Sequence, residues 1–289
     1  MRILPNCRVP ASLLMSPLLA LLASCGGGGS VGTDIADAYV CGLRNCTESS
    51  TLQTDEISTH FDAEQSEGQP TVKVNAYLGK SANLFTALKL APGEQLRASV
   101  DGGSETGMAN TGMARVDFEA SLPTAAARPR VTVVFVRDGV RHVNEVVLPA
   151  AFTVVQPTGT PTLARTAGSL LVRLGPDVSG SSVGVHASGR CSRTDGSVFD
   201  VKSRPLVPRL ESGAPNDFRL DTLPLDQALN AESQSQNNSN PNTPLVARCE
   251  LSLVWYAGVR GTTASTLNRH SIYNGYRRAG HAIVYDARL

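Results

Sequence analysis

Apolar and polar residues alternate in short runs from about residue 70 to the end of the chain. The segments TVKVNAYL (71–78) and ARVDFEASL (114–122) both place an apolar residue at every second position. Because successive side chains of a strand point to opposite faces, this period predicts half-buried β-strands. The residues expected to face a core are Val72, Val74, Ala76 and Leu78 in the first segment and Val116, Phe118, Ala120 and Leu122 in the second.

Turn residues separate these runs. The segment VTVVFVRDGVRHVNEVVL (131–148) places Asp138-Gly139 between two β-rich runs, and this pair suits a two-residue type I′ hairpin turn. Pro92-Gly93 predicts a further turn between strands within the segment 84–100. The number of short strands between residues 70 and 156 is typical of a β-sandwich.

A second group of strand patterns follows residue 157. These are SLLVRL (169–174), SVGVHASGRCS (182–192), SVFDVKS (197–203) and LVARCELSLVWYAGV (245–259). The last is the most apolar of the group, so it predicts a central strand with Cys249 facing the core. Between these strands, residues 211–244 are rich in Asn, Gln and Ser. This composition predicts a mobile polar insertion with no more than one or two helical turns.

The N-terminus carries a different pattern. Arg2 and Arg8 lead into an apolar stretch that ends in Leu22-Ala23-Ser24-Cys25, and this stretch is shorter than the roughly 20 residues that span a bilayer. The four residues resemble the lipobox of bacterial lipoproteins. The resemblance, confined to residues 1 to about 26, implies a signal peptide over 1–24 and lipidation of Cys25. An ordinary secretory signal is the alternative.

The residue after the cysteine is Gly26, which in lipoproteins favours transport to the outer membrane over retention in the inner one. Four glycines and a serine then provide a flexible exit from the bilayer. Between residues 34 and 67 acidic residues far outnumber the single basic residue, Arg44. Such a segment buries little apolar surface, so residues 25–69 are predicted to form a disordered acidic tether.

Charge and cysteine content narrow the function classes. The formal net charge is +1, which offers no electrostatic basis for binding nucleic acid, and nothing in the sequence implies a cofactor. Beyond Cys7 and Cys25, four cysteines remain, and an exported protein is expected to pair them. Of the three connectivities, Cys41–Cys46 with Cys191–Cys249 is preferred, because each pair lies within one segment. A zinc site is the alternative, although the spacing fits no known finger.

Residues 70–289 resemble a family of uncharacterised exported bacterial proteins. The resemblance rests on EVVLPAAFTVVQPTGTPTLART (145–166), on the Ser-Gly-x-Cys strand around Cys191 and on the later strand around Cys249. It implies an all-β fold with two immunoglobulin-like β-sandwiches in series, over 70–156 and 157–289, and a Cys191–Cys249 bridge that crosses the second. Trp255 departs from the antibody pattern, because it follows the second cysteine and does not lie between the two.

Two motifs are candidates for function. GSSVG (180–184) matches the G-x-S-x-G nucleophile elbow with Ser182 as nucleophile, but a Gly/Ser turn between strands uses the same residue types. The C-terminal segment 268–289 interleaves arginines with tyrosines, and both offer planar groups for stacking and hydrogen bonding. Its candidate binding residues are Arg269, Tyr273, Tyr276, Arg277 and Arg278.

The alternative for this segment is a final hairpin that turns at Asn274-Gly275, with half-buried tyrosines and with arginines protecting the sheet edge. The sequence therefore predicts a non-catalytic binding or scaffolding lipoprotein, anchored in the outer membrane through Cys25, with an envelope protein or a glycan as partner. A serine hydrolase using Ser182 and a passive spacer are the alternatives. No metal site is expected, because none of the five histidines has a ligand partner at suitable spacing.

Overall fold

The structure is a computed structural model that describes residues 41, 45–81, 83–111 and 116–289. Over these residues the chain is mostly β, as the alternating pattern predicted, with several sheets and the helix α2 (Thr222–Gln236). Three short 3-10 helices are η1 Ser49–Thr51, η2 Thr54–Glu56 and η3 Arg165–Ala167. None of the helices in these ranges is long and apolar enough to span a lipid bilayer. The predicted signal peptide (1–24) and Cys25 lie outside the described residues.

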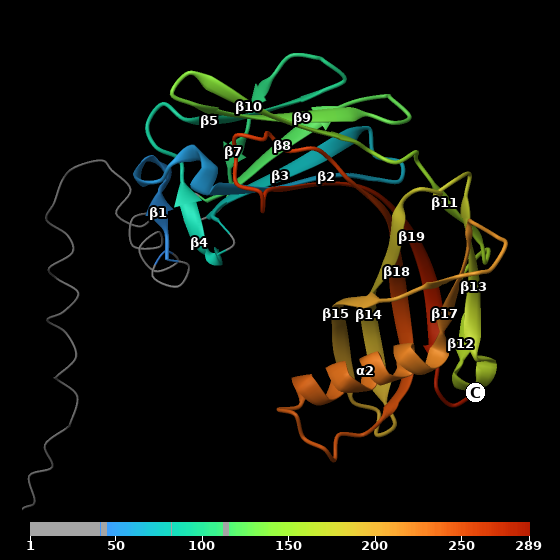
Figure 1. Cartoon of the computed structure of the whole chain (residues 1–289). Coiled ribbons are helices and arrows are strands. Elements are labelled where there is room, and N and C mark those ends of the chain that lie inside the picture. Colours follow the sequence, from blue (N-terminus) through green and yellow to red (C-terminus); the bar gives the residue numbers. More distant parts are fainter. Residues whose placement is uncertain (1–40, 42–44, 82, 112–115) are drawn as a thin grey trace, which may run out of the picture.

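One long sheet runs through the whole described part of the chain, in the order β1-β4-β3-β2-β19-β18-β14-β15, with β8 and β7 beside β3 and with β12 beside β19. Figure 1 shows that this sheet bends sharply along β18 and β19. Its strands are β1 Thr47–Glu48, β2 Ile57–Ser66, β3 Thr71–Lys80, β4 Asn83–Lys89, β7 Ala109–Asn110, β8 Asp117–Pro123, β12 Thr162–Ala164, β14 Ser182–Arg193, β15 Val198–Leu206, β18 Val246–Arg260 and β19 Ile272–Asp286.

Two four-stranded sheets pack against the long sheet, one on each arm of the bend (Figure 1). The sheet ordered β10-β9-β5-β6 covers the arm that contains β2 and β3, and its strands are β5 Gln95–Val100, β6 Thr106–Gly107, β9 Arg130–Arg137 and β10 Val140–Val147. The sheet ordered β11-β13-β17-β16 covers the other arm, and its strands are β11 Thr153–Gln156, β13 Ser169–Gly175, β16 Arg209–Leu210 and β17 Asp217–Asp221.

Each arm has its own hydrophobic core, but the β18–β19 hairpin contributes to both. Tyr273 near the start of β19 packs in the first core with Phe61, while Trp255 of β18 and Tyr285 of β19 are fully buried in the second. Two separate sandwiches divided at residues 156 and 157 were expected. The structure instead joins them, because both strands of this hairpin are 15 residues long and extend through both arms.

Part of the predicted tether is wrong. Residues 57–66 form β2, which lies between β3 and β19 and buries Ile57, Phe61 and Ala63 completely. The prediction failed because it was based on the acidic composition of the whole segment 34–67 and not on the alternation within 57–66, whose two acids are Asp62 and Glu64. They occupy only the solvent-facing positions of the strand.

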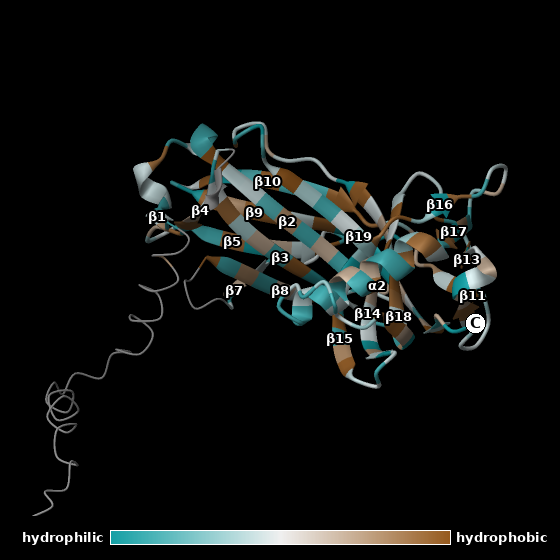
Figure 2. Cartoon of the chain, turned by 90° about the horizontal axis from the view of Figure 1, so that it is seen from below, coloured by the Kyte–Doolittle hydropathy of each residue, from teal (hydrophilic) through white to brown (hydrophobic). Residues whose placement is uncertain are grey.

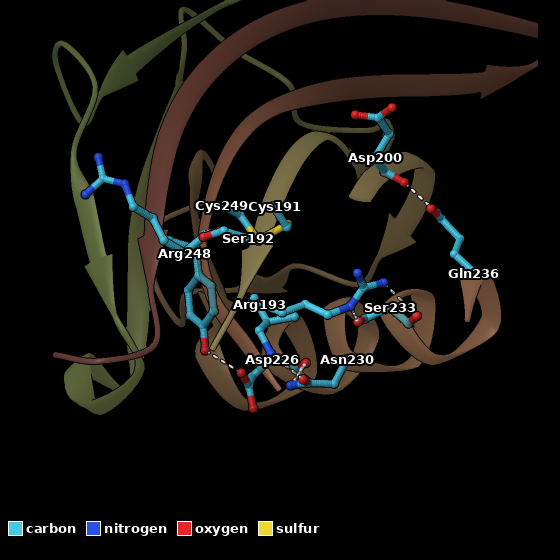
Figure 3. Close-up of a disulfide and its surroundings, with 12 residues drawn as sticks. Cys191, Ser192, Arg193, Asp200, Asp226, Asn230, Ser233, Gln236, Arg248 and Cys249 are labelled. Carbon is cyan, nitrogen blue, oxygen red and sulfur yellow. Dashed lines mark hydrogen bonds between the residues drawn. A yellow bond between two sulfur atoms is a disulfide. The ribbon is translucent and has the colours of Figure 1, made fainter. Parts of the chain in front are cut away.

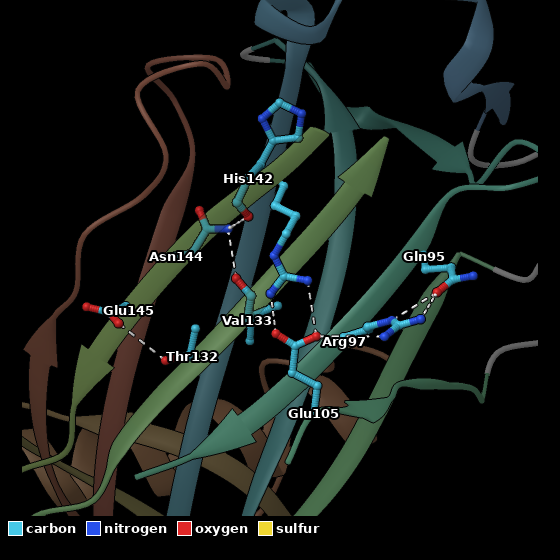
Figure 4. A network of polar contacts seen from close by, with 9 residues as sticks. Gln95, Arg97, Glu105, Thr132, Val133, His142, Asn144 and Glu145 are labelled. Atoms are coloured by element: carbon cyan, nitrogen blue, oxygen red, sulfur yellow. Dashed lines mark hydrogen bonds and ion pairs between the residues drawn. The ribbon is translucent and has the colours of Figure 1, made fainter. Parts of the chain in front are cut away.

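The DG turn of the predicted hairpin is confirmed. Asp138 and Gly139 both have positive φ, 52° and 74°, and the turn joins β9 to β10 with Val140 opposite Arg137. Both positive φ values are what a type I′ turn requires. Figure 4 shows the polar side chains of this sheet, where Glu105 contacts the guanidinium of Arg97. The Pro92-Gly93 turn is also present, closed by a hydrogen bond from Glu94 N to Ala91 O of 3.0 Å.

The predicted mobile insertion is wrong at its centre, where α2 forms a helix of 15 residues. Leu225 and Leu229, one helical turn apart, are both buried in the second core. The polar side chains that suggested mobility bond to the neighbouring strands. Figure 3 shows Arg193 Nε donating to Ser233 Oγ at 2.7 Å and Gln236 Nε2 donating to Asp200 O at 2.5 Å. Tertiary contacts therefore hold a helix that its composition did not favour.

Both preferred disulfides are present, Cys41–Cys46 and Cys191–Cys249. The second bridge does not cross between the sheets of a sandwich, as the immunoglobulin-like resemblance implied. Cys191 of β14 and Cys249 of β18 lie directly opposite each other on neighbouring strands of the long sheet (Figure 3), with their Cα atoms 4.0 Å apart. Cys249 does face the core, as predicted. The immunoglobulin-like topology itself stays a prediction.

Candidate functional site

The five C-terminal candidate residues do not form one patch. Arg269 is exposed in the connection between β18 and β19, and the other four lie on β19 itself. Because side chains alternate along a strand, Tyr276 and Arg278 point to one face of the long sheet. Tyr273 and Arg277 point to the opposite face, toward the cores.

The alternative of a turn at Asn274-Gly275 is wrong as well, because both residues lie inside β19 and pair with β18. The chain turns earlier, between residues 260 and 272. Gly275 is needed for close packing and not for a turn. A Cβ at this position would come within 2.8 Å of Val146 Cγ2 on β10. The Asn-Gly pair is typical of a turn, but here its glycine serves sheet packing.

Tyr273 and Arg277 are structural. Tyr273 is fully buried against Phe61, with ring centroids 5.5 Å apart, and burial raises the pKa of its phenol. Arg277 is only 6% exposed. Its guanidinium donates to Pro149 O at 3.0 Å, to Ala127 O at 2.9 Å and to the Gln65 side chain. These bonds tie the β10–β11 connection, which joins the two arms, and the β8–β9 connection to the long sheet, beside a cavity of about 780 Å³.

The other face of the long sheet is the candidate functional site. We call it the inner face, because Figure 1 places it on the inner side of the bend, where neither four-stranded sheet covers it. Seen from below in Figure 2, hydrophilic and hydrophobic residues are mixed along its strands. Its side chains include His60, Asp62 and Glu64 of β2, Lys73, Asn75 and Tyr77 of β3, His186 and Arg190 of β14, Asp200 of β15, Glu250, Ser252, Tyr256 and Arg260 of β18, and Asn274, Tyr276 and Arg278 of β19.

Two tyrosines and a histidine form an aromatic group at the centre of the inner face. The rings of Tyr256 and Tyr276 meet edge to face, with centroids 6.0 Å apart and planes at 86°. His186 lies 5.4 Å from Tyr256 on the other side. Each tyrosine sits directly opposite a glycine on the neighbouring strand, Tyr256 opposite Gly184 and Tyr276 opposite Gly258. The missing side chains leave room for each ring to lean across the sheet.

A second group of polar and aromatic residues lies at the β3 end of the inner face. His60 and Tyr77 face each other with centroids 6.1 Å apart, and with Asp62 and Asn75 they border a hollow of about 310 Å³. Asn274 Nδ2 donates to Asp62 Oδ1 at 3.0 Å and orients this carboxylate. Burial lowers the pKa of His60, outweighing the opposite effect of Asp62, so this imidazole is neutral at neutral pH.

Charges on the inner face are largely paired. Arg278 Nη2 lies 2.5 Å from Glu64 Oε2, and Lys73 Nζ lies 2.9 Å from Glu119 Oε2. The face therefore presents hydrogen-bonding groups and rings without a strong net charge. Among the described residues no group of three His, Cys, Asp or Glu side chains is arranged to hold a metal ion.

Ser182, the candidate nucleophile, begins strand β14. Its hydroxyl donates to the carbonyl of Gly258 at 3.1 Å. The nearest histidine along the strand, His186, bonds through Nδ1 to Ser203 Oγ at 2.7 Å. A nucleophile elbow places its serine in a strand-turn-helix bend, whereas here the serine leads from a glycine turn into a strand.

Of the residues on the inner face, the sequence singled out only Tyr276 and Arg278. Tyr256 had a detectable signal, since it alternates with the apolar positions of the segment 245–259 and so faces away from the core. Lys73, Asn75 and Tyr77 had the same signal, since they alternate with the core-facing residues of the segment 71–78. His60 and Tyr77 join the face only because β2 pairs in parallel with β19, a contact between segments more than 200 residues apart.

No protein-family model matches the chain, and no curated protein matches it. Among solved structures, it is similar to the Yersinia pseudotuberculosis adhesin InvE at 12% identity, covering 79% of this chain and 60% of that one, with a TM-score of 0.22. Extracellular domains 3–5 of Drosophila OTK are similar at 8% identity, with 78% and 61% covered and a TM-score of 0.23. A DUF4785 family protein from Legionella pneumophila is similar at 13% identity, with 67% and 50% covered and a TM-score of 0.21. The chain thus spans at most about three fifths of these structures, and likeness at this level does not define a shared function.

Proposed function

We propose that this protein is a non-catalytic binding module of the cell envelope, held in the outer membrane by lipid on Cys25 and presenting the inner face to its partner. The observation that carries the proposal is the inner face itself. It is a sheet surface with five aromatic rings, three tyrosines and two histidines, and none of the sheets or helices in the described part of the chain covers it (Figure 1). Solvent-accessible tyrosine side chains with polar neighbours are typical of binding surfaces.

Two features support a place outside the cytoplasm. The structure holds both disulfides, and such bonds persist in oxidising compartments. The lipobox-like residues 22–25 would add an anchor, and two or three acyl chains together hold a protein on a membrane stably. The surroundings of Ser182 support a role without catalysis, because its hydroxyl is bonded to a backbone carbonyl.

Lipidation of Cys25 can be tested directly by substitution. A Cys25→Ser variant cannot form the thioether, so we expect it to move from the membrane fraction to the soluble fraction of the envelope. The measurement is fractionation of cells followed by immunoblotting, with a Cys7→Ser variant as the control that keeps its anchor. A Cys25→Ser protein that stays with the membranes would show that the lipobox resemblance is misleading.

The binding surface is tested by photo-cross-linking in intact cells. A photoreactive phenylalanine at Ser252, an exposed position of the inner face on β18, is expected to capture the partner. The matched control is the same group at Val143, which is 45% exposed on β10, on the outer side of a four-stranded sheet. Equal capture from both positions, or capture from neither, would contradict the assignment of the inner face.

A further inference from the structure

We infer that the ligand of the inner face is a glycan chain without strong net charge, with a sugar ring packed on Tyr256 and Tyr276. This inference rests on the function proposed above and names the chemistry of its ligand. A sugar presents apolar C–H faces and polar hydroxyl edges. Its binding site therefore needs solvent-accessible aromatic rings with hydrogen-bonding groups around them, and the inner face supplies both.

The rings have the required exposure and geometry. Tyr256 and Tyr276 are half-buried, and their edge-to-face contact leaves an aromatic corner open to solvent. Within the described ranges no hydrogen bond from either phenol hydroxyl to another protein group is found, so both are free to bond to a ligand. His186 stands at the edge of this corner and uses only Nδ1 in its bond to Ser203, which leaves Nε2 for a hydroxyl of the ligand.

The second group of the inner face extends the site beyond one sugar. The hollow beside His60 and Tyr77 measures about 310 Å³, at the lower end of the range for ligand pockets. Its polar groups, the Asp62 carboxylate and the Asn75 amide, suit sugar hydroxyls. Tyr276 pairs with Glu64, four positions along β2 from His60, which places the two groups roughly 15 Å apart at the usual rise per residue. One sugar ring cannot fill both, so the ligand is an oligosaccharide or a polymer.

The pairing of charged side chains on the inner face distinguishes between neutral and strongly charged polymers as ligands. Arg278 forms an ion pair with Glu64 and Lys73 forms one with Glu119, and the strand neighbours of Arg190 are the acids Asp200 and Glu250. A site for nucleic acid or for a highly sulfated chain needs unpaired arginines and lysines along its length. The paired charges of the inner face favour a ligand that is bound by stacking and hydroxyl contacts.

The structure offers a sharp variant for testing this site. A Cβ at Gly184 would come within 2.2 Å of the Tyr256 hydroxyl, and its three closest neighbours are all atoms of that one side chain. Gly184→Ala must therefore push the Tyr256 ring out of its place, with little else to move. Gly280→Ala is the matched control, because a Cβ there meets nothing within 4 Å although Gly280 lies on the inner face.

The probes are purified peptidoglycan sacculi and an array of neutral soluble oligosaccharides, each offered to the full chain in detergent. We expect retention on at least one glycan, a loss of affinity of about tenfold or more for Gly184→Ala and for Tyr256→Ala, and no change for Gly280→Ala. Thermal unfolding of each variant is measured in parallel, so that a loss of affinity caused by unfolding can be distinguished from the loss of a binding contact.

The possible outcomes distinguish a failure of the glycan inference from a failure of the proposed binding function. If no glycan is retained while the Ser252 cross-linker captures a protein, the glycan inference fails and the binding module stands. If Gly184→Ala and Tyr256→Ala bind a glycan as tightly as the unmodified protein does, the aromatic corner is not the binding site and the inference also fails. If neither glycan nor protein is captured, both the inference and the proposed function fall.

Discussion

Removing the Cys191–Cys249 disulfide, by the double substitution Cys191→Ala and Cys249→Ala, is expected to lower the free energy of unfolding by about 4 kcal/mol. The bridge closes a loop with a sequence separation of 58 residues. In the chain-entropy model a loop of this length greatly restricts the unfolded chain. Both cysteines are also buried in the second core, so their loss weakens packing there. The measurement is urea-induced unfolding of the oxidised protein, followed by tryptophan fluorescence.

The fluorescence signal reports on the second core, because Trp255 is the only tryptophan of the chain and lies fully buried there. The control is the double substitution Cys41→Ala and Cys46→Ala. That bridge closes a separation of only five residues, so the expected loss is about 2 kcal/mol. Equal effects of the two double variants would show that loop length does not govern the contribution of these bridges.

Arg277→Ala is expected to lower the free energy of unfolding by about 3 kcal/mol, although the neighbouring Arg278→Ala should cost less than about 1 kcal/mol. Arg277 is buried, and its loss leaves the carbonyls of Pro149 and Ala127 and the side chain of Gln65 without their donor. Arg278 is exposed and makes a surface ion pair with Glu64. The two arginines are adjacent in sequence but point to opposite faces of the long sheet, and this difference in burial is the reason for the different losses of stability.

Thermal or urea unfolding of the two variants checks this difference, and Arg277→Lys is a useful third variant. A lysine keeps the charge but cannot reach three acceptors in different directions, so it should restore little of the lost stability. Comparable destabilisation by Arg277→Ala and Arg278→Ala would contradict the assignment of the two arginines to opposite faces. Ligand binding should be weakened more by Arg278→Ala than by Arg277→Ala, since of these two arginines only Arg278 lies on the inner face.

The local features of the fold were predictable because they depend on neighbours in sequence. The apolar set Val72, Val74, Ala76 and Leu78 is buried as its alternation predicted. The turn at Asp138-Gly139 follows from the positive φ that these two residues tolerate. The pairing of the cysteines was also reached from the sequence, since each pair lies within one segment.

Predictions based on composition were less successful. Residues 57–66 were assigned to an acidic tether, but their acids occupy only one face of β2. The Asn-, Gln- and Ser-rich stretch was expected to be mobile, but Leu225 and Leu229 anchor α2 in the second core. Composition averages over a segment, whereas folding depends on which side chains of that segment find a buried face.

The sequence by itself determined the mostly β character of this protein, the turns at Asp138-Gly139 and Pro92-Gly93, the core-facing residues of its alternating segments and a preferred pairing of its cysteines. Only the tertiary structure decided which face each candidate side chain occupies and which distant strands lie together. Tyr276 and Arg277 are both chemically suitable for binding, yet the pairing of β19 with β2 and β18 leaves the first accessible on the inner face and buries the second. The inner face exists because strands more than 200 residues apart share one sheet, and pairing over such distances is set by the packing of whole sheets.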